Sequence, residues 1–270
     1  MQILPKAALG CAILYFLLGG TPGISQGVPP TPHSVVVIAH RGNHLSVPEN
    51  TLAACQEAIR VGADYVEVDL RTTKDGKMVL LHDAKVDRTT NGQGPLSELT
   101  WKQAKRLRIK SKDGAEYRIP TFEEILKLCR GKMNIYLDFK DADIAKTWAL
   151  IQRTHMEKQV VVYLNKEKQY HAWKATAPDL PLMTSLPDSY RTDKGLETFL
   201  KKMGVQILDN LQTPELVKEA KSLGVDVWLD VQSPLEGPVS WQAALQKGVA
   251  GLQTDHPEAL IQYLKSQNMR

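Results

Sequence analysis

Short apolar runs recur along the chain from residue 35 onward, and polar or glycine-containing segments separate them. Runs of about four to eight apolar residues are typical of strands that are buried on both faces of a parallel sheet. The pattern predicts eight such strands: Val35–Ala39, Tyr65–Arg71, Asn134–Phe139, Val160–Leu164, Pro181–Ser185, Val205–Asp209, Val225–Val231 and Gly251–Thr254.

Helical spacing of apolar residues lies between these strands, for example in Asn50–Val61, Ile144–His155, Pro214–Leu223 and Pro257–Ser266. At the first helix, Glu49 and Asn50 are expected to serve the helix start, with Asn50 as N-cap. Repeated strand–helix units with short connections predict an α/β protein, specifically a TIM barrel, which is a closed (β/α)8 barrel. A doubly wound open sheet is the alternative, and the absence of a glycine-rich phosphate loop after the first strand disfavours it.

One segment interrupts this rhythm and predicts a β-hairpin after the second strand. Asp75–Gly76 is a strong two-residue turn signal between two β-like runs. A turn at these two residues would place His82 opposite Asp69. The segment that follows, Asp83–Pro120, is polar and basic, and a short helix is expected at Leu99–Leu107. We interpret residues 83–120 as a small insertion over the barrel mouth.

The first 34 residues have a different character from the rest. An apolar run, Ala7–Leu18, follows Lys6 and precedes the small-residue pattern Gly23–Ser25. This arrangement predicts a secretory signal peptide at residues 1–25, because the apolar run is too short to span a bilayer; an uncleaved anchor is the alternative. Three prolines in Gln26–His33 predict a linker at residues 26–34, before a barrel domain at residues 35–270. The expected location is secreted or periplasmic, with no stable membrane insertion after cleavage.

Composition narrows the choice of partners. A chain of 270 residues, of which 43% are hydrophobic, is long enough for one barrel domain. Its net charge of +4 is mild and its Lys and Arg residues are scattered, which argues against a nucleic-acid partner and suits a small anionic molecule. The sequence leaves the oligomeric state open.

The chain has three cysteines, of which Cys11 lies in the predicted leader. Cys55 and Cys129 each fall on the apolar stripe of a predicted helix. Free cysteines are among the most buried residue types, so two reduced core thiols are favoured. A disulfide between them, in an oxidising compartment, is the alternative.

In a barrel of this type, the side chains that do chemistry lie at the carboxyl ends of the strands. The polar or aromatic residues expected at these ends and on the hairpin are His40, Arg41, Glu67, Asp69, His82, Asp138, Lys140 and Trp228. Glu67 and Asp69 are two residues apart, so both point to the same face of their strand. The sequence therefore predicts a single mouth on which carboxylates, histidines and cationic side chains converge.

Three of these residues, Glu67, Asp69 and Asp138, are carboxylates that would repel one another if they were buried without a cation. One divalent cation, Ca²⁺ or Mg²⁺, resolves this repulsion because both ions take oxygen ligands. The site lacks the clustered cysteines that are typical of structural zinc. The cofactor expected is therefore one Ca²⁺ or Mg²⁺ ion.

The remaining side chains suit an anionic substrate. Arg41 and Lys140 could bind an anion that bridges to the metal, and a guanidinium matches two phosphate oxygens. Two histidines, His40 and His82, on either side of a phosphate suit general acid–base catalysis near neutral pH.

At this point the sequence closely resembles the glycerophosphodiester phosphodiesterase family. The matching segments are HRG (His40–Gly42), PENT (Pro48–Thr51), GADYVEVDL (Gly62–Leu70), TKDG (Thr73–Gly76), HD (His82–Asp83), RTTNG (Arg88–Gly92), DFK (Asp138–Lys140), VWLDV (Val227–Val231) and TDHP (Thr254–Pro257). The resemblance covers residues 35–266. HRG, then a Glu-x-Asp pair, then HD, in this order and spacing, is a specific combination.

The resemblance implies a TIM barrel that hydrolyses the phosphodiester of deacylated phospholipids to glycerol 3-phosphate and an alcohol, with a divalent metal, often Ca²⁺ or Mg²⁺. It implies metal ligation by Glu67, Asp69 and Asp138, acid–base catalysis by His40 and His82, and phosphate binding by Arg41 and Lys140. The attacking group would be a glycerol hydroxyl of the substrate or water.

Two positions depart from the family pattern. Asp138 stands where the family usually has Glu, one methylene longer, so ligation of the metal directly or through water stays open. The seventh strand has Trp228 followed by Leu-Asp-Val, where the family tends to have Trp-Thr-Val-Asn. Trp228 is interpreted as a substrate-binding residue, with a core tryptophan as the alternative.

Two rival functions remain. An enzyme of the related phospholipase D toxin type would act on lysophospholipids or sphingomyelin and would have apolar loops at the mouth, whereas the insertion here is mostly polar. A catalytically silent barrel that only binds phosphodiesters would lack a histidine or a metal carboxylate, and none is missing here, although Asp138 departs from the family.

Overall fold

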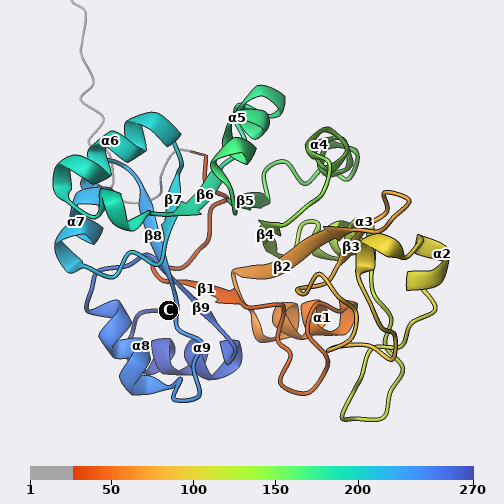
Figure 1. The fold of residues 1–270 in the computed structure, drawn as a ribbon. Coiled ribbons are helices and arrows are strands. Elements are labelled where there is room, and N and C mark those ends of the chain that lie inside the picture. Colours follow the sequence, from red (N-terminus) through yellow and green to blue (C-terminus); the bar gives the residue numbers. More distant parts are fainter. Residues whose placement is uncertain (1–26) are drawn as a thin grey trace, which may run out of the picture.

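The computed structural model describes residues 27–270, so the predicted signal peptide and Cys11 lie outside the described residues. Eight parallel strands form a barrel in the order β1-β9-β8-β7-β6-β5-β4-β2, and β1 pairs with β2 to close it (Figure 1). The parallel strands are β1 (Val36–Ala39), β2 (Tyr65–Thr72), β4 (Asn134–Phe139), β5 (Val160–Leu164), β6 (Leu182–Ser185), β7 (Ile207–Asp209), β8 (Asp226–Asp230) and β9 (Gly251–Thr254). The predicted TIM barrel is confirmed, and the open sheet is excluded.

Helices follow the strands and surround the barrel (Figure 1). They are α1 (Leu52–Val61), α2 (Trp101–Ala104), α3 (Phe122–Cys129), α4 (Ile144–Arg153), α5 (Glu167–Thr176), α6 (Asp193–Met203), α7 (Pro214–Ser222), α8 (Pro238–Leu245) and α9 (Pro257–Ser266). In α3, the apolar residues Phe122, Ile125 and Cys129 recur every three or four positions, and all are fully buried. A capping box fixes the start of this helix, since the N–H of Thr121 donates to Glu124 Oε2 at 2.8 Å.

The hairpin after β2 forms, but its predicted register is wrong by one residue. Strand β3 (Met78–Leu80) pairs antiparallel with β2, with Leu80 opposite Leu70, and Leu81 donates its N–H to the Asp69 carbonyl at 3.1 Å. The reason is a three-residue loop, residues 74–76, in which Gly76 has φ of 80° but Asp75 does not have the positive φ that a two-residue Asp-Gly turn of type I′ requires. His82 therefore lies one residue beyond the position opposite Asp69.

The segment 83–120 packs against the hairpin. It contains a 3-10 turn, Leu96–Glu98, and the short helix α2, which covers only part of the predicted helix Leu99–Leu107. Its apolar side chains form a separate small core with the hairpin, made of Val79, Leu81, Val86, Leu96, Ala104, Ile109 and Ile119. This apolar contact explains why a mostly polar segment folds back against β3 (Figure 1).

The predicted linker is a structural part of the barrel. Val28 is 7% exposed and packs in the barrel interior, and the Tyr65 hydroxyl donates to the Pro29 carbonyl at 2.6 Å. At the same face, Asp64 accepts hydrogen bonds from His33 Nδ1 at 2.6 Å and from Arg270 Nη1 at 2.6 Å. Both ends of the described chain thus pack at the amino-terminal ends of the strands. Within residues 27–270, no helix is long and apolar enough to cross a bilayer.

Cys55 on α1 and Cys129 on α3 are free and fully buried, as the sequence predicts. Burial raises the pKa of the Cys129 thiol to about 12 and that of Cys55 well above its usual value. Both thiols therefore stay protonated at physiological pH and act as small apolar core residues.

Candidate active site

The carboxyl ends of the barrel strands surround a polar cavity of about 340 Å³. It is lined by His40, Arg41, Glu67, Asp69, His82, Tyr136, Asp138, Tyr163, Asn165, Ser185, Asp209, Asn210, Asp230 and Gln253. Six of the eight predicted site residues are in this lining; Lys140 lies at its edge, and Trp228 is elsewhere. The cavity is where we place the candidate active site.

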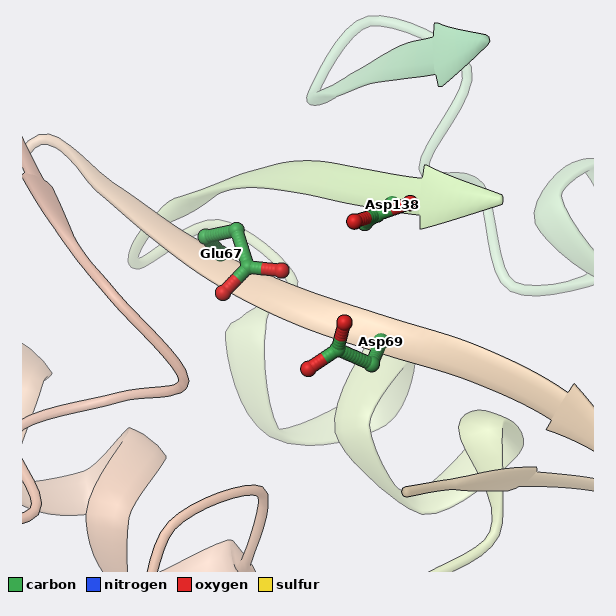
Figure 2. A group of neighbouring side chains, drawn as sticks. All are labelled: Glu67, Asp69 and Asp138. Carbon is green, nitrogen blue, oxygen red and sulfur yellow. The ribbon is translucent and has the colours of Figure 1, made fainter. Parts of the chain in front are cut away.

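Three carboxylates meet on one side of the cavity (Figure 2). Glu67 and Asp69 come from β2, and Asp138 comes from β4, where it is directly paired with Asp69. One oxygen from each carboxylate lies within 4.8 Å of the other two. An all-oxygen set of this kind fits a hard divalent cation such as Ca²⁺ or Mg²⁺.

The charges of this carboxylate group are only partly compensated. Burial, followed by the charges of Asp69 and Asp138, raises the pKa of Glu67 well above its usual value. Burial also raises the pKa of Asp138, while the ammonium of Lys140 opposes that rise. A site that penalises its own negative charges in this way gains from binding a cation.

Neighbouring side chains hold the carboxylates in place. The backbone N–H of Arg41 donates to Glu67 Oε2 at 2.8 Å, and Asn165 Nδ2 donates to Asp138 Oδ1 at 2.7 Å. Asn50 Nδ2 donates to Asp69 Oδ2 at 2.8 Å, and Asn50 Oδ1 accepts from the Asp69 N–H at 3.1 Å. Asn50 is thus not the N-cap that the sequence predicts.

The N-cap of α1 is Thr51, whose hydroxyl accepts from the N–H of Ala54 at 3.1 Å. Asn50 lies one position earlier, in the left-handed region with φ of 54°, a conformation that asparagine adopts more readily than most residues. This conformation accompanies its two hydrogen bonds to Asp69. The sequence shows a good capping residue but not the contact 19 positions away.

Two cationic side chains accompany the carboxylates. Arg41 Nη1 donates to Glu49 Oε1 at 2.9 Å, and its Nε is buried with no hydrogen-bond partner among the described residues. Lys140 Nζ lies 3.1 Å from Asp69 Oδ1 and also donates to Asp138. Arg41 Nε also lies 3.7 Å from Asp69 Oδ2, so the guanidinium charge is placed next to the carboxylate group.

Each of the two predicted catalytic histidines has a carboxylate on its Nδ1. His40 Nδ1 lies 2.7 Å from Asp255 Oδ1, and His82 Nδ1 lies 2.7 Å from Asp83 Oδ1. A carboxylate at Nδ1 fixes the ring orientation and leaves Nε2 as the nitrogen that can exchange a proton. The sequence contained both acids, in the segments TDHP and HD, but their partnership with the histidines depends on the fold.

The opposite wall of the cavity carries a second pair of carboxylates, which the sequence analysis did not identify as a site. Asp209 on β7 and Asp230 on β8 both accept hydrogen bonds from Asn210 Nδ2, at 3.0 and 2.9 Å, and Gln253 Nε2 donates to Asp230 at 2.7 Å. Burial and the charge of Asp230 raise the pKa of Asp209 to about 8. This wall offers several hydrogen-bond acceptors to the non-phosphate part of a ligand.

Trp228 is a core residue, so its predicted role in substrate binding is wrong. It is 1% exposed and packs against Tyr65 and Tyr136 in the barrel interior. Alternate residues of a barrel strand point inward in successive layers. Asp230, two residues later, lines the cavity, and Trp228 fills the layer beneath it.

Replacing Gly42 with alanine is expected to destabilise the protein by about 3 kcal/mol or more. Gly42 has φ of 85°, and an added Cβ would lie 2.6 Å from Ala54 Cβ on α1. The matched control is Gly114→Ala, where φ is 75° but the space is open, so only the smaller backbone penalty applies. Urea unfolding of the two variants measures the difference, and equal losses would contradict the steric argument.

Replacing Asp209 with asparagine is expected to flatten the pH dependence of stability. Because the pKa of Asp209 is about 8 when folded, the folded state holds a proton that the unfolded chain releases above pH ~4. The wild type therefore loses stability between pH ~4 and ~8, on the order of 5 kcal/mol, relative to Asp209→Asn. Unfolding across this pH range tests the effect, with the 96% exposed Asp188 changed to asparagine as control; parallel curves for wild type and Asp209→Asn would refute it.

Comparison with known proteins places these features in a wider context. A family model described as "Glycerophosphoryl diester phosphodiesterase family" matches residues 40–259. A glycerophosphodiester phosphodiesterase of Caldanaerobacter subterraneus is 31% identical over 248 residues, which cover 85% of this chain and 98% of that protein.

Two solved structures have the same fold. One is a glycerophosphodiester phosphodiesterase from Agrobacterium tumefaciens, with a TM-score of 0.74 at 24% identity, covering 83% of this chain and 98% of that one. The other is an Oleispira antarctica phosphodiesterase in complex with the product sn-glycerol-3-phosphate, with a TM-score of 0.76 at 22% identity, covering 85% of this chain and 96% of that one.

Proposed function

This chain belongs to the glycerophosphoryl diester phosphodiesterase family and is a phosphoric diester hydrolase, and from this premise we propose that it hydrolyses glycerophosphodiesters to sn-glycerol 3-phosphate and an alcohol in a reaction that depends on one divalent cation. The observation that carries the proposal is the cavity that joins a buried carboxylate group, an arginine and two histidines that each have a carboxylate on Nδ1.

Glu67, Asp69 and Asp138 would hold the cation, Ca²⁺ or Mg²⁺. When bound, the cation supplies positive charge next to the phosphodiester and stabilises the negative charge that develops on it. Arg41 and Lys140 contribute further positive charge at this end of the cavity. These residues bind and orient the phosphate.

The two histidines transfer protons. An attacking oxygen forms a bond to phosphorus while the bond from phosphorus to the alcohol oxygen breaks. One histidine takes the proton of the attacking group, and the other gives a proton to the leaving alcohol oxygen. Asp255 holds the ring of His40 through Nδ1, and Asp83 does the same for His82, so that Nε2 of each ring is left for the proton transfer.

The attacking group is either water or a hydroxyl of the substrate's own glycerol. Attack by the glycerol hydroxyl produces a cyclic phosphate, which water then opens. Single-turnover NMR with labelled solvent oxygen separates the two routes: a cyclic product supports internal attack, and label in the phosphate during the first step argues against it.

The function is tested by measuring the release of glycerol 3-phosphate from glycerophosphocholine and glycerophosphoethanolamine, with EDTA, Mg²⁺ or Ca²⁺. Release that requires a divalent cation is the expected result. A folded, cation-binding protein that releases nothing would refute the proposal and favour the silent binding barrel. The solved relative with bound sn-glycerol-3-phosphate supports the choice of product.

A second candidate substrate class, the lysophospholipids, is favoured by apolar residues at the mouth. Leu235 is 89% exposed and Val239 is 84% exposed after β8, and Leu45 is 55% exposed after β1. Both segments contact Asp255: its N–H donates to Glu236, beside Leu235, and His44, beside Leu45, lies 3.6 Å from its carboxylate. Exposed apolar groups here could contact one acyl chain. Choline release from lysophosphatidylcholine, compared with that from glycerophosphocholine, decides between the two classes.

For the cellular location, we propose secretion or export to the periplasm, on the basis of the signal peptide predicted from the sequence. A signal peptide at residues 1–25 would direct the protein to a secreted or periplasmic location, where it would meet small phosphodiesters rather than nucleic acid. Fractionation of cells that express the full chain, with N-terminal sequencing of the mature protein, tests this location.

A further inference from the structure

A continuous chain of ion pairs runs along the rim of the cavity and joins the two sides of the phosphate site. It begins at His82, whose Nδ1 lies 2.7 Å from Asp83 Oδ1, and continues from Asp83 Oδ2 to Arg88 Nε at 2.6 Å. Arg88 then donates to both oxygens of Glu49, at 2.9 and 2.8 Å. Glu49 in turn accepts from Arg41 Nη1 at 2.9 Å.

Arg88 is the centre of this chain. All three of its guanidinium nitrogens are used, two in a fork to Glu49 and the third, Nε, on Asp83. A single exposed ion pair contributes little, but a forked arginine that satisfies two carboxylates at once fixes their relative positions. Lysine has one ammonium on a flexible stem and cannot make the same contact.

The strands by themselves do not fix the distance between Arg41 and His82. Arg41 follows β1, and His82 follows β3, and these two strands are not paired with each other in the sheet of the described chain. Arg88 lies in the segment 83–120 and reaches across to Glu49, 39 positions earlier. The chain of ion pairs is therefore a direct side-chain connection between two separately anchored pieces of the site.

We propose that Arg88 is a positioning residue, which sets the separation and orientation of Arg41 and His82 through Glu49 and Asp83. This inference rests on the proposed function. Arg88 does not line the cavity, so it acts through its two partners and not on the substrate. The segment 83–120 would then have a role in the site, because it places Arg88 at the rim of the cavity.

Charge balance supports the same role. The two positive charges of Arg41 and Arg88 balance the two negative charges of Glu49 and Asp83. Because Arg88 pairs with Glu49, this carboxylate does not fully neutralise Arg41, which faces the substrate. The hydrogen bond from Arg88 is the largest influence on Asp83 and holds the pKa of its carboxyl down at about 2. The other titratable groups in contact with Asp83 or Arg88 are His82 and Glu49. Without Arg88, Glu49 would bind Arg41 alone, and Asp83 would protonate at a higher pH.

The test is Arg88→Gln, which keeps a polar side chain but removes the charge and the two terminal nitrogens that bind Glu49. We expect kcat/KM for glycerophosphocholine to fall about 10- to 100-fold, a loss typical of groups that are slightly misplaced. The acid side of the pH–activity profile should move to higher pH, because the Asp83 carboxyl that holds His82 protonates at a higher pH once Arg88 is removed. Arg88→Lys should recover part of the activity. The remaining difference in kcat/KM from wild type measures the contribution of the forked contact with Glu49.

The matched control is Arg108→Gln in the same segment. Arg108 pairs with Glu116 at 3.0 Å, with both side chains more than half exposed, and lies away from the cavity lining. Its kcat/KM should stay within about twofold of wild type, because exposed pairs of this kind contribute little. Thermal unfolding of all variants shows whether a loss of activity is a loss of fold; if Arg88→Gln does not fold, Arg88→Lys carries the comparison.

An Arg88→Gln variant with wild-type kcat/KM and an unshifted pH profile would overturn the positioning role while leaving the proposed function intact. A wild type that hydrolyses no glycerophosphodiester would overturn the proposed function instead. In that case calorimetric binding of sn-glycerol 3-phosphate to the wild type and to Arg88→Gln still tests the placement of Arg41, with at least about a threefold weaker affinity expected for the variant. Equal affinities, or no binding by either protein, would overturn the positioning role.

Discussion

Replacing His40 with alanine is expected to lower kcat/KM for glycerophosphocholine by a factor on the order of 10² to 10⁴, the range measured for the loss of a general acid or base. The ring lines the cavity, and Asp255 holds its Nδ1 at 2.7 Å, so its Nε2 is the proton-exchanging atom. Alanine removes that atom but leaves the carboxylates that bind the cation unchanged. Divalent-cation binding should therefore survive the substitution while turnover is lost.

The comparison for His40→Ala is His171→Ala on the outer helix α5, where the histidine is exposed. This control should retain wild-type kinetics. A second comparison is Asp255→Asn, which keeps the ring of His40 but removes the charge behind it, and which should lose less activity than His40→Ala. A His40→Ala enzyme with turnover close to wild type would remove His40 from the acid–base pair.

Replacing Glu67 with glutamine is expected to abolish detectable turnover and, in the absence of metal, to make the protein more stable. Burial and the charges of Asp69 and Asp138 raise the pKa of Glu67, so the ionised carboxylate costs folding free energy at neutral pH. Glutamine has nearly the same shape and no charge, and this cost disappears. The same substitution removes one of the three oxygen ligands of the cation, and with it the stabilisation that cation binding brings.

The measurement is thermal unfolding with EDTA, Mg²⁺ or Ca²⁺, made beside the activity assay. For the wild type, a divalent cation should raise Tm by several degrees, whereas Glu67→Gln should start from a higher Tm in EDTA and respond weakly to either ion. The exposed carboxylate of Glu215 on α7, changed to glutamine, provides the control and should behave as wild type. A full cation response in Glu67→Gln would show that the ion binds elsewhere.

The barrel could be predicted from the sequence because its signals are local. Each of the eight parallel strands is a short apolar run, and the predicted ends agree with the structure to within two residues. The carboxylate group was predictable once the barrel and its strands were predicted. Glu67 and Asp69 share a face because side chains alternate along a strand, and Asp138 joins them because the barrel pairs it with Asp69.

The features that escaped prediction depend on contacts between distant segments or on single backbone angles. Asp255 lies 215 positions from His40, so only the closed barrel brings the two together. The register of the hairpin depends on the backbone of Asp75, which lacks the positive φ of a two-residue type I′ turn, so that the loop has three residues. A tryptophan at position 228 is compatible with a place in the core or in the wall of the substrate site. The structure places its side chain in the interior layer of the barrel, beneath the cavity.

The packing of both ends of the described chain against the amino-terminal face of the barrel has a practical consequence for orientation. Ser34 donates its hydroxyl proton to the Met269 carbonyl at 2.9 Å, so the first and last described segments lie side by side, while the catalytic cavity opens at the other end of the strands. A support, tag or fused domain attached at the carboxyl terminus would therefore leave the cavity facing away from the attachment. Immobilised molecules would then present their substrate entrance to the solution.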